Sequence, residues 1–346
     1  MKTLLNASFI LMILLIIGCT GKKPEPVSSA QTDSVLKTAQ SFFGVLPSEV
    51  QNPSNTITPE KVLLGKTLFY DTRLSAKGNN SCNDCHNLTT YGVEHSSKSR
   101  GDEGMDGSRN SPTVLNAALH FVQFWDGRAK DVEEQAGGPI LNPVEMNIHS
   151  KEFLENRLDS IQGYRQLFAA AFPDAAKPVT FENVQLAIAA FERTLLTPSR
   201  FDTYLNGETS ALDEQEKRGL DLFIKTGCAS CHSGVLLGGS MFQKAGLFAD
   251  YHTLPGSNPK DKGRFEVTQA VADTDIFKVP SLRNIAETYP YFHDGAMEDL
   301  PDAIEAMANL QLNKNLSEEE VEDMVAFLKS LTGKIPEDAL MVPVMP

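Results

Sequence analysis

The sequence has little tryptophan, an uneven number of cysteines and a shortage of basic residues. Of its 346 residues one is Trp, five are Cys, and 31 are Lys or Arg against 45 Asp or Glu, so the formal net charge is −14. This balance argues against nucleic acid as a partner, because binding to phosphates needs a basic surface. An acidic surface instead favours solubility and would attract a basic protein partner.

Long hydrophobic runs are also missing. The one marked run, Phe9–Ile17, is too short to span a membrane, follows Lys2 and stops just before Cys19. This pattern predicts a signal peptide of lipoprotein type over residues 1–18, with Cys19 as the lipidated residue and the periplasm as location. The alternative is a plain secretory signal with an incidental cysteine. Residues 19–45, rich in Lys, Pro, Ser, Gln and Thr, predict a flexible tether.

The other four cysteines form two short motifs of the same form. Each motif has two cysteines separated by two residues and followed at once by histidine: Cys82, Cys85 and His86, then Cys228, Cys231 and His232. C-x-x-C-H is the signature of c-type haem attachment, in which both thiols bond to the haem and the histidine binds the iron. A zinc site or a redox disulfide would need only the cysteines. Two copies in an exported chain favour two covalently bound haem c groups.

The segments around the two motifs are also duplicated. A helix capped by Thr58 is predicted before the first motif, and one following Asp213 before the second. After the motifs, Pro112 and Pro280 start similar segments, and equal spacings lead to Trp125 and His293, each followed by Asp-Gly.

Strand patterns of any length are absent, so the predicted fold is mainly α, with two cytochrome c-like helical domains, each around one haem. An amphipathic segment over 180–196 is expected to close the first unit, and 197–210 to join the units. The last helix should begin near Ser317 and end at Gly333. The expected domains are 46–200 and 201–346.

The motifs in order resemble those of the bacterial di-haem cytochrome c peroxidases. The resemblance covers most of residues 46–335 and rests, besides the haem motifs, on RNSPTVLN (109–116), FWDGRA (124–129), VEM (144–146), DKGRFEVT (261–268), VPSLRN (279–284) and YFHDGAM (291–297). It implies an enzyme that reduces hydrogen peroxide with electrons from a small donor, such as a monohaem cytochrome c or a copper protein. Family members are often homodimers.

The resemblance implies different roles for the two haems. The C-terminal haem would receive electrons, with His232 and Met307 as axial ligands; Met297 is the rival to Met307. The N-terminal haem would bind peroxide, with His86 as proximal ligand. Glu145 would then be the acid–base group and Gln135 its hydrogen-bonding neighbour in the distal pocket. Trp125 would help to carry electrons between the haems, and His293 would lie near a haem edge or propionate.

The same resemblance implies one calcium ion between the haems. Its ligands would be the side chain of Asn110 and the carbonyl oxygens of Thr288 and Pro290, with water completing the shell.

One position departs from the family pattern. Many members cap the resting peroxidatic iron with a histidine, and that position holds Asp102 here. The one histidine in this loop is His95. Either His95 reaches the iron from a shifted position, or the iron is open in the oxidised protein and needs no reductive activation.

Two other functions compete with peroxide reduction. A related di-haem oxidase that modifies tryptophans of a partner protein would carry tyrosine in place of Met307. A non-catalytic di-haem electron carrier would keep both irons six-coordinate, and Glu145 argues against this. No role can be argued for His120, His149 or His252.

Overall fold

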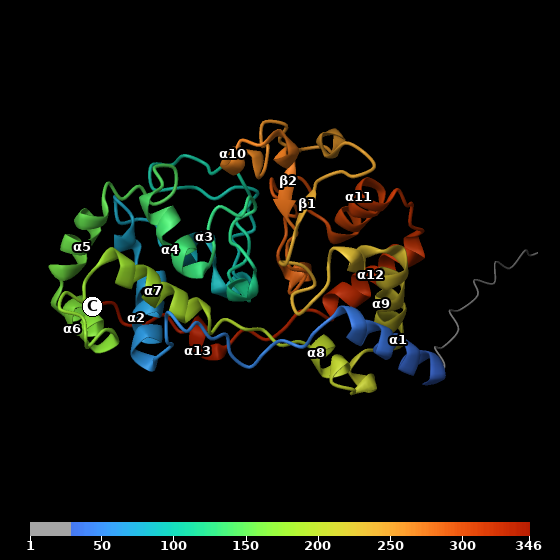
Figure 1. Cartoon of the computed structure of the whole chain (residues 1–346), viewed down its shortest axis with the longest axis horizontal. Coiled ribbons are helices and arrows are strands. Elements are labelled where there is room, and N and C mark those ends of the chain that lie inside the picture. The colour runs from blue at the N-terminus through green and yellow to red at the C-terminus, as the bar shows by residue number, and fades with distance from the viewer. Residues whose placement is uncertain (1–28) are drawn as a thin grey trace, which may run out of the picture.

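The structure is a computed structural model that describes residues 29–346 (Figure 1). The described residues are mainly helical, as predicted, with one short two-stranded antiparallel sheet. The elements are α1 (Ser29–Phe42), α2 (Pro59–Phe69), α3 (Cys82–Cys85), α4 (Val132–Leu141), α5 (Lys151–Asp159), α6 (Gln162–Ala171), α7 (Phe181–Glu192), α8 (Arg200–Leu205), α9 (Glu214–Thr226), β1 (Phe242–Lys244), α10 (Phe265–Thr268), β2 (Ile276–Lys278), α11 (Leu300–Leu312), α12 (Glu318–Lys329) and α13 (Glu337–Leu340). The signal peptide and Cys19 lie outside the described residues.

The helices form two units that lie side by side, one on the left and one on the right of Figure 1. In the N-terminal unit α2 packs against α6 and α7, and α4 packs against α7. In the C-terminal unit α9 packs against α12, and α11 also packs against α12. Each unit has its own hydrophobic core. The predicted pair of helical units is therefore confirmed.

Equivalent helices begin in the same way in the two units. The Thr58 hydroxyl accepts a hydrogen bond from the backbone N–H of Lys61 (3.2 Å), which caps α2. The Asp213 carboxylate accepts one from the N–H of Glu216 (2.8 Å), which caps α9. Both predicted helix starts are confirmed, because each depends on a local signal.

Glycine allows both helix pairs to cross closely. A Cβ atom on Gly65 of α2 would lie 1.8 Å from the carbonyl oxygen of Ala187 in α7, and one on Gly219 of α9 would lie 1.9 Å from that of Asp323 in α12. Real side chains cannot approach a backbone so closely. The two crossings therefore depend on the matching glycines of the duplicated sequence.

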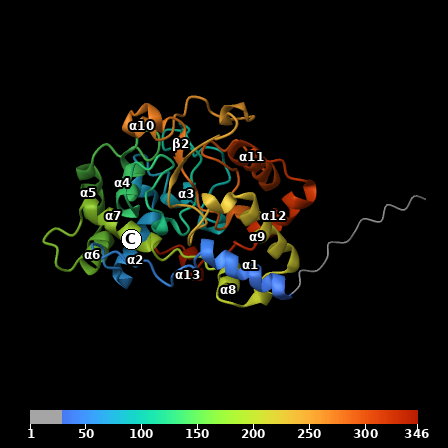
Figure 2. The same ribbon diagram turned by 45° about the vertical axis from the view of Figure 1, so that its right-hand side comes forward.

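The prediction of a tether over 19–45 is wrong for the part that the structure describes. Residues 29–42 form α1, which packs against α8 and α9 of the C-terminal unit. The second view, in Figure 2, also shows α1 beside these two helices. Val35, Ala39 and Phe43 are buried in that unit's core together with Phe201. These apolar residues are spaced about one helical turn apart, which stabilises the helix by burial.

The C-terminal end of the chain packs on the N-terminal unit, just as the N-terminal helix α1 packs on the C-terminal unit. It leaves the C-terminal unit after α12, which ends at Lys329 rather than at Gly333, and runs to the N-terminal unit. There Ile335 and Ala339 pack in a cluster with Phe69. The expected domain 201–346 is therefore wrong at its end, because 335–346 belong with the N-terminal unit. The expected joint 197–210 also contains a helix, α8, whose residues join the C-terminal core.

Candidate functional site

A cavity in the N-terminal unit brings together most of the residues predicted for peroxide chemistry. Its open space, including the mouth, is about 1270 Å³. The residues around it come from α3, α4 and α7, from the loops between α3 and α4, and from the segments just before α3 and just after α4. Among them are the predicted residues Cys82, Cys85, His86, Asn110, Trp125, Gln135 and Glu145.

The first C-x-x-C-H motif forms a single helical turn on the wall of this cavity. The Asp84 carboxylate accepts hydrogen bonds from both the backbone N–H and the hydroxyl of Ser81 (2.6 Å each), which caps α3. The N–H of His86 donates to the carbonyl of Cys82 (2.9 Å). This turn presents both thiols and the imidazole to one space, as covalent haem attachment requires.

The ionisation of these side chains also suits that use. The thiols of Cys82 and Cys85 are free, and burial raises the pKa of the Cys85 thiol to about 12. A reactive redox pair would instead have a lowered pKa. Burial lowers the pKa of His86 to about 4, which keeps the imidazole neutral and able to bind iron.

The second motif has similar geometry in the C-terminal unit. The N–H groups of Cys231 and His232 both donate to the carbonyl of Cys228, at 3.2 and 3.0 Å. His232 Nδ1 lies 3.0 Å from the carbonyl oxygen of Leu237. When this nitrogen carries the proton and donates, Nε2 is left free for a metal. Both motifs thus fit a covalently held haem.

Met307 lies on α11, which packs beside this second motif. Ile304, one turn earlier on α11, shares a hydrophobic cluster with Ala229 of the motif. Residues three apart on a helix lie on the same face, so Met307 is directed toward the same side as Ile304. The rival Met297 lies before α11, in a cluster with Tyr251 and with Ala306 and Leu310 of α11.

Glu145 is the acidic group of the N-terminal cavity. Its carboxylate accepts a hydrogen bond from the Asn142 amide (2.7 Å). Burial raises the pKa of Glu145 above its usual value, while the charge of Arg128 and the Asn142 bond oppose the shift. Gln135 of α4 also lines the cavity, so the two predicted distal residues face the same space.

Asp102, at the position of the family's capping histidine, is fixed in the loop. It is 3% exposed, and its carboxylate accepts a hydrogen bond from the N–H of Lys77 (3.0 Å). Its own N–H donates to the carbonyl of Glu145 (2.7 Å). The adjacent Gly101 lies so close to the backbone of Val144 that a Cβ atom on Gly101 would be 2.0 Å from the Val144 carbonyl oxygen. The loop is therefore packed directly against the segment that carries Glu145.

His95 does not reach this cavity in the structure. Its Nδ1 lies 3.0 Å from the carbonyl oxygen of Tyr289 in the other unit, and its ring stacks on the Tyr289 ring at 4.0 Å between centroids. It is not one of the residues that line the space. His95 thus contacts Tyr289 rather than the cavity, and its role as a shifted distal ligand stays a prediction.

Trp125 lies where the two units meet. Its Nε1–H donates to the carbonyl of Asn110 (2.8 Å), and its ring meets the ring of His293 edge to face at 6.3 Å between centroids. His293 is buried and stacks on Phe277 (3.9 Å). The two residues predicted to be equivalent are thus neighbours across the interface.

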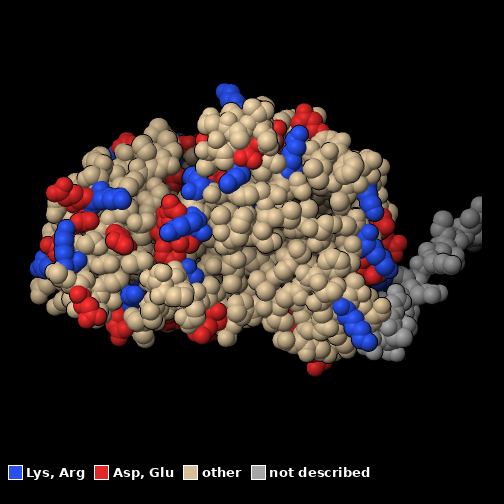
Figure 3. Space-filling view, in the orientation of Figure 1, with Lys and Arg blue, Asp and Glu red and all other residues tan. Residues whose placement is uncertain are grey.

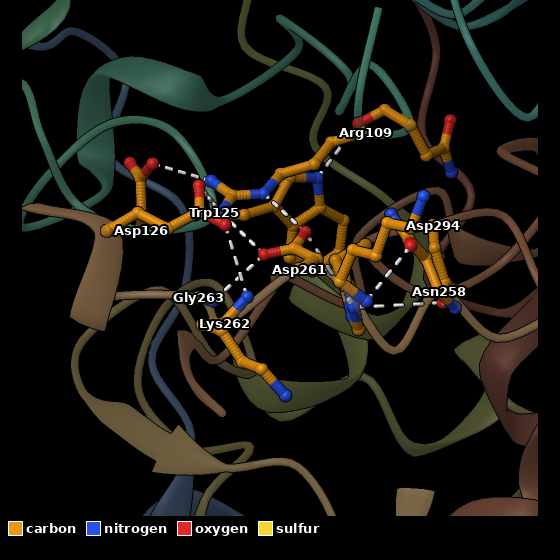
Figure 4. Close-up of polar contacts among 12 residues, drawn as sticks. Arg109, Trp125, Asp126, Asn258, Asp261, Lys262, Gly263 and Asp294 are labelled. Carbon is orange, nitrogen blue, oxygen red and sulfur yellow. Dashed lines mark hydrogen bonds and ion pairs between the residues drawn. The ribbon is translucent and has the colours of Figure 1, made fainter. Parts of the chain in front are cut away.

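An ionic network holds Trp125 and its surroundings in place (Figure 4). The Arg109 guanidinium binds Asp126 of the same unit (2.5 Å) and Asp261 of the other unit (2.6 and 2.7 Å). All three side chains are at least nine-tenths buried. Two paired hydrogen bonds to one carboxylate give this contact a defined geometry.

Two of the three predicted calcium ligands lie together. The Asn110 amide donates to the carbonyl oxygen of Pro290 (2.7 Å) and to that of Phe292 (3.2 Å). Thr288 lies two residues before Pro290, and no contact joins it to Asn110. Within residues 29–346 no group of three or more His, Cys, Asp or Glu side chains is arranged to hold a metal.

Sequence reasoning missed two charged residues of the cavity. Arg128 lines it and lies over the ring of Phe124 (3.5 Å). Glu192, the last residue of α7, is 4% exposed, and burial raises its pKa to about 8. Arg128 stands in the quoted FWDGRA motif, whereas only the buried face of α7 pointed to Glu192.

Comparisons with known proteins agree with this geometry. The model of the family described as di-haem cytochrome c peroxidase matches residues 59–210, and the cytochrome c model matches residues 216–332. The cytochrome c551 peroxidase of Pseudomonas aeruginosa is 47% identical over 89% of this chain and 89% of its own length. The corresponding protein of Nitrosomonas europaea is 46% identical over 86% and 88%.

A solved structure is similar to the whole fold. A MauG-like protein associated with microbial copper homeostasis is 31% identical, with a TM-score of 0.77 over 86% of this chain and 97% of that one. The methylamine utilization protein MauG of Methylorubrum extorquens is 35% identical over 95% of this chain and 93% of its own length.

Proposed function

Because the chain belongs to the di-haem cytochrome c peroxidase family, we propose that it reduces hydrogen peroxide to water with electrons from a small redox protein. The balanced reaction is H2O2 + 2 e⁻ + 2 H⁺ → 2 H2O. The observation that carries this proposal is the shared cavity of His86, Gln135 and Glu145. A haem held there by Cys82, Cys85 and His86 would supply the iron that binds peroxide and transfers electrons to it.

Glu145 moves the proton in this proposal. Its carboxylate accepts a proton from one oxygen of the peroxide and delivers it to the other oxygen, which leaves as water. The raised pKa of Glu145, caused first by burial, suits a group that both takes and returns a proton. The Asn142 hydrogen bond holds one carboxylate oxygen, and Gln135 orients the substrate from α4.

Electrons enter at the C-terminal unit, where His232 and Met307 are the proposed iron ligands. The contacts of Trp125 with Asn110 and of its ring with His293 support a short route across the interface. The Arg109 network keeps these residues at fixed separation, which electron transfer requires. The cavity with its acid–base group argues against a pure electron carrier, and Met307 argues against the tryptophan-modifying oxidase.

We further propose that the peroxidatic iron is open in the oxidised protein. Asp102 is engaged with Lys77 and Glu145, and His95 with Tyr289, so neither is free to cap an iron in the cavity. No reductive activation step is then needed.

Electron paramagnetic resonance of the oxidised protein, with turnover assayed on the same sample, tests this function. A high-spin signal with immediate peroxide turnover is expected. Two low-spin signals with activity only after pre-reduction would overturn the open site but keep the peroxidase. Two low-spin signals without activity under any condition would overturn the peroxidase and favour the electron carrier.

The remaining features are proposals of the same kind. A calcium ion would bind at Asn110 and Pro290, with Thr288 as the third ligand. We also propose that the protein is exported to the periplasm, carries a lipid on Cys19 and forms a homodimer. The helices of the described part are too short or too polar to cross a bilayer. Acidic and basic side chains are interspersed on the face in Figure 3, so this face shows no large patch of one sign.

A further inference from the structure

The contact between the two units is reciprocal. Asn110 and Lys278 hold matching places, each two residues before the proline of its repeat. The backbone N–H of Asn110 donates to the carbonyl of His293 (2.8 Å), and that of Lys278 donates to the carbonyl of Trp125 (2.7 Å). Since Trp125 and His293 also match, the duplicated units meet through two equivalent hydrogen bonds.

The side chains at these matching places differ. The Asn110 amide crosses to the other unit and donates to the carbonyl of Pro290 (2.7 Å). Lys278 crosses in the opposite direction, and its Nζ lies 2.7 Å from Nδ1 of His120, the repeat counterpart of Thr288. One copy therefore has an amide facing carbonyl oxygens, and the other has an amine facing an imidazole.

This amine and imidazole are buried together. Lys278 is 4% exposed, and burial lowers the pKa of its amine to about 7. Burial and then the charge of Lys278 lower the pKa of His120 well below its usual value. His120 Nε2 is buried without a hydrogen-bond partner. The pair can therefore hold one proton at neutral pH, on the amine, with the imidazole as acceptor.

Nearby charged groups are either exposed or bound to other partners. Lys244, on the strand that pairs with β2, is exposed. Asp126, next to Trp125, is bound by Arg109 and Arg128. Arg264 lies over the ring of Phe242 (4.1 Å) and donates to the carbonyl of Asp126. None of them acts on Lys278, since burial is the one cause of its lowered pKa.

The pair lies close to the second haem motif. His120 packs against Gly239, where a Cβ atom would be 2.8 Å from the imidazole Cδ2. On the adjacent Gly238 a Cβ atom would be 3.3 Å from Nδ1 of His232. Two consecutive glycines thus separate the buried pair from the proposed iron ligand.

We infer that Lys278 and His120 form a proton-binding site that takes up a proton when an electron enters the C-terminal unit. The inference rests on the proposed role of this unit in electron entry. The electron comes from the redox partner and the proton from solvent, and the neutral amine becomes an ammonium. The added negative charge strengthens proton binding at the amine, and neither residue touches peroxide. Electron entry would thereby bring in one of the protons that the overall reaction consumes.

The test is a spectroelectrochemical titration of the C-terminal haem in the intact holoprotein from pH 5.5 to 8.5. By linkage, the midpoint potential should fall as the pH rises through neutrality, because reduction takes up a proton in this range and a lower proton concentration opposes that uptake. Lys278→Met should abolish this fall, and Lys244→Met, a lysine on the paired strand, should keep it. Proton release or uptake on reduction, followed with a pH-indicating dye, should show uptake at pH 7 that Lys278→Met loses.

A flat potential in the unmodified protein, or an unchanged slope in Lys278→Met, would overturn the inference. If Lys278→Met does not fold, His120→Thr, which restores the residue of the other repeat, should shift the pH at which the potential begins to fall; no shift would overturn it. Absent peroxide turnover with the slope retained would instead count against the proposed function alone.

Discussion

The N-terminal and C-terminal units share a scaffold but differ in the residues that face their sites. Their helix pairs cross at Gly65 and Gly219, and the two units contact each other through matching backbone hydrogen bonds. The first unit adds a distal wall with Glu145, whereas the second presents Met307 from a helix. Duplication therefore preserved close backbone contacts, which tolerate no side chain, and left the side chains free to diverge toward two chemistries.

The largest expected effect concerns the acid–base group that the first unit has. Glu145→Gln keeps the shape but cannot accept a proton, so peroxide turnover should fall about 10²- to 10⁴-fold. Steady-state assays at matched haem content measure this. Glu134→Gln, an exposed change on the neighbouring helix, is the control and should retain activity. Unchanged turnover in Glu145→Gln would remove Glu145 from the mechanism.

The raised pKa of Glu145 also predicts an acidic limb in the pH–rate profile. Burial raises the pKa of Glu145 above 4.5, and the base form is the active one, so turnover should fall as the pH drops through this raised value. The acidic limb of the pH–rate profile should disappear in the residual activity of Glu145→Gln. An unaltered limb would assign the titration to another group.

The next effect concerns electron entry in the second unit. Met307→His replaces a thioether by an imidazole, which lowers the haem potential, so turnover with a protein donor should fall roughly tenfold or more. The spectrum of the C-terminal haem should change while peroxide binding in the first unit stays the same. Met297→Leu is the matched control. Loss of the sulfur-ligand spectrum in the control instead would make Met297 the ligand.

Gly65→Ala and Gly219→Ala test whether the scaffolds are equivalent. Each adds a methyl group against a backbone carbonyl, at 1.8 and 1.9 Å, so each should destabilise its unit by about 3 kcal/mol. Denaturant unfolding measures both. Gly138→Ala, whose added carbon would meet the Phe124 ring at 3.4 Å, should cost far less. A large loss of stability in one unit only would show that the two scaffolds are not equivalent.

The smallest effect lies where the two units share one residue. The Thr197 hydroxyl accepts hydrogen bonds from the amides of Asn116 (2.8 Å) and Asn284 (2.9 Å), which are repeat counterparts. Thr197→Val leaves both buried amides without this partner and should cost about 1–3 kcal/mol. Asn116→Ala and Asn284→Ala should each become less costly in the Thr197→Val background. Additive costs would show that the shared hydroxyl does not couple the units.

Much of the fold and of the site was predictable from the sequence because the signals are local. Thr58 and Asp213 start their helices through their own hydrogen bonds, and each C-x-x-C-H motif places its thiols and imidazole within one turn. The family pattern located Glu145, Gln135 and Trp125, which line one cavity.

The failures concern contacts between distant segments. The composition of residues 29–42 predicted a polar tether, but Val35 and Ala39 are buried in the core of the C-terminal unit. The last residues of the chain pack on the N-terminal unit. The sequence left two alternatives for His95, a shifted iron ligand or no ligand, and in the structure it stacks on Tyr289 of the other unit.

The sequence by itself therefore determined the duplication, the haem attachment and the helix starts, since each depends on residues a few positions apart. Only the tertiary structure decided which unit the two ends join, how Asp102 is fixed beside Glu145, and that Lys278 meets His120. Those outcomes depend on burial between segments far apart in the chain, which no local pattern records.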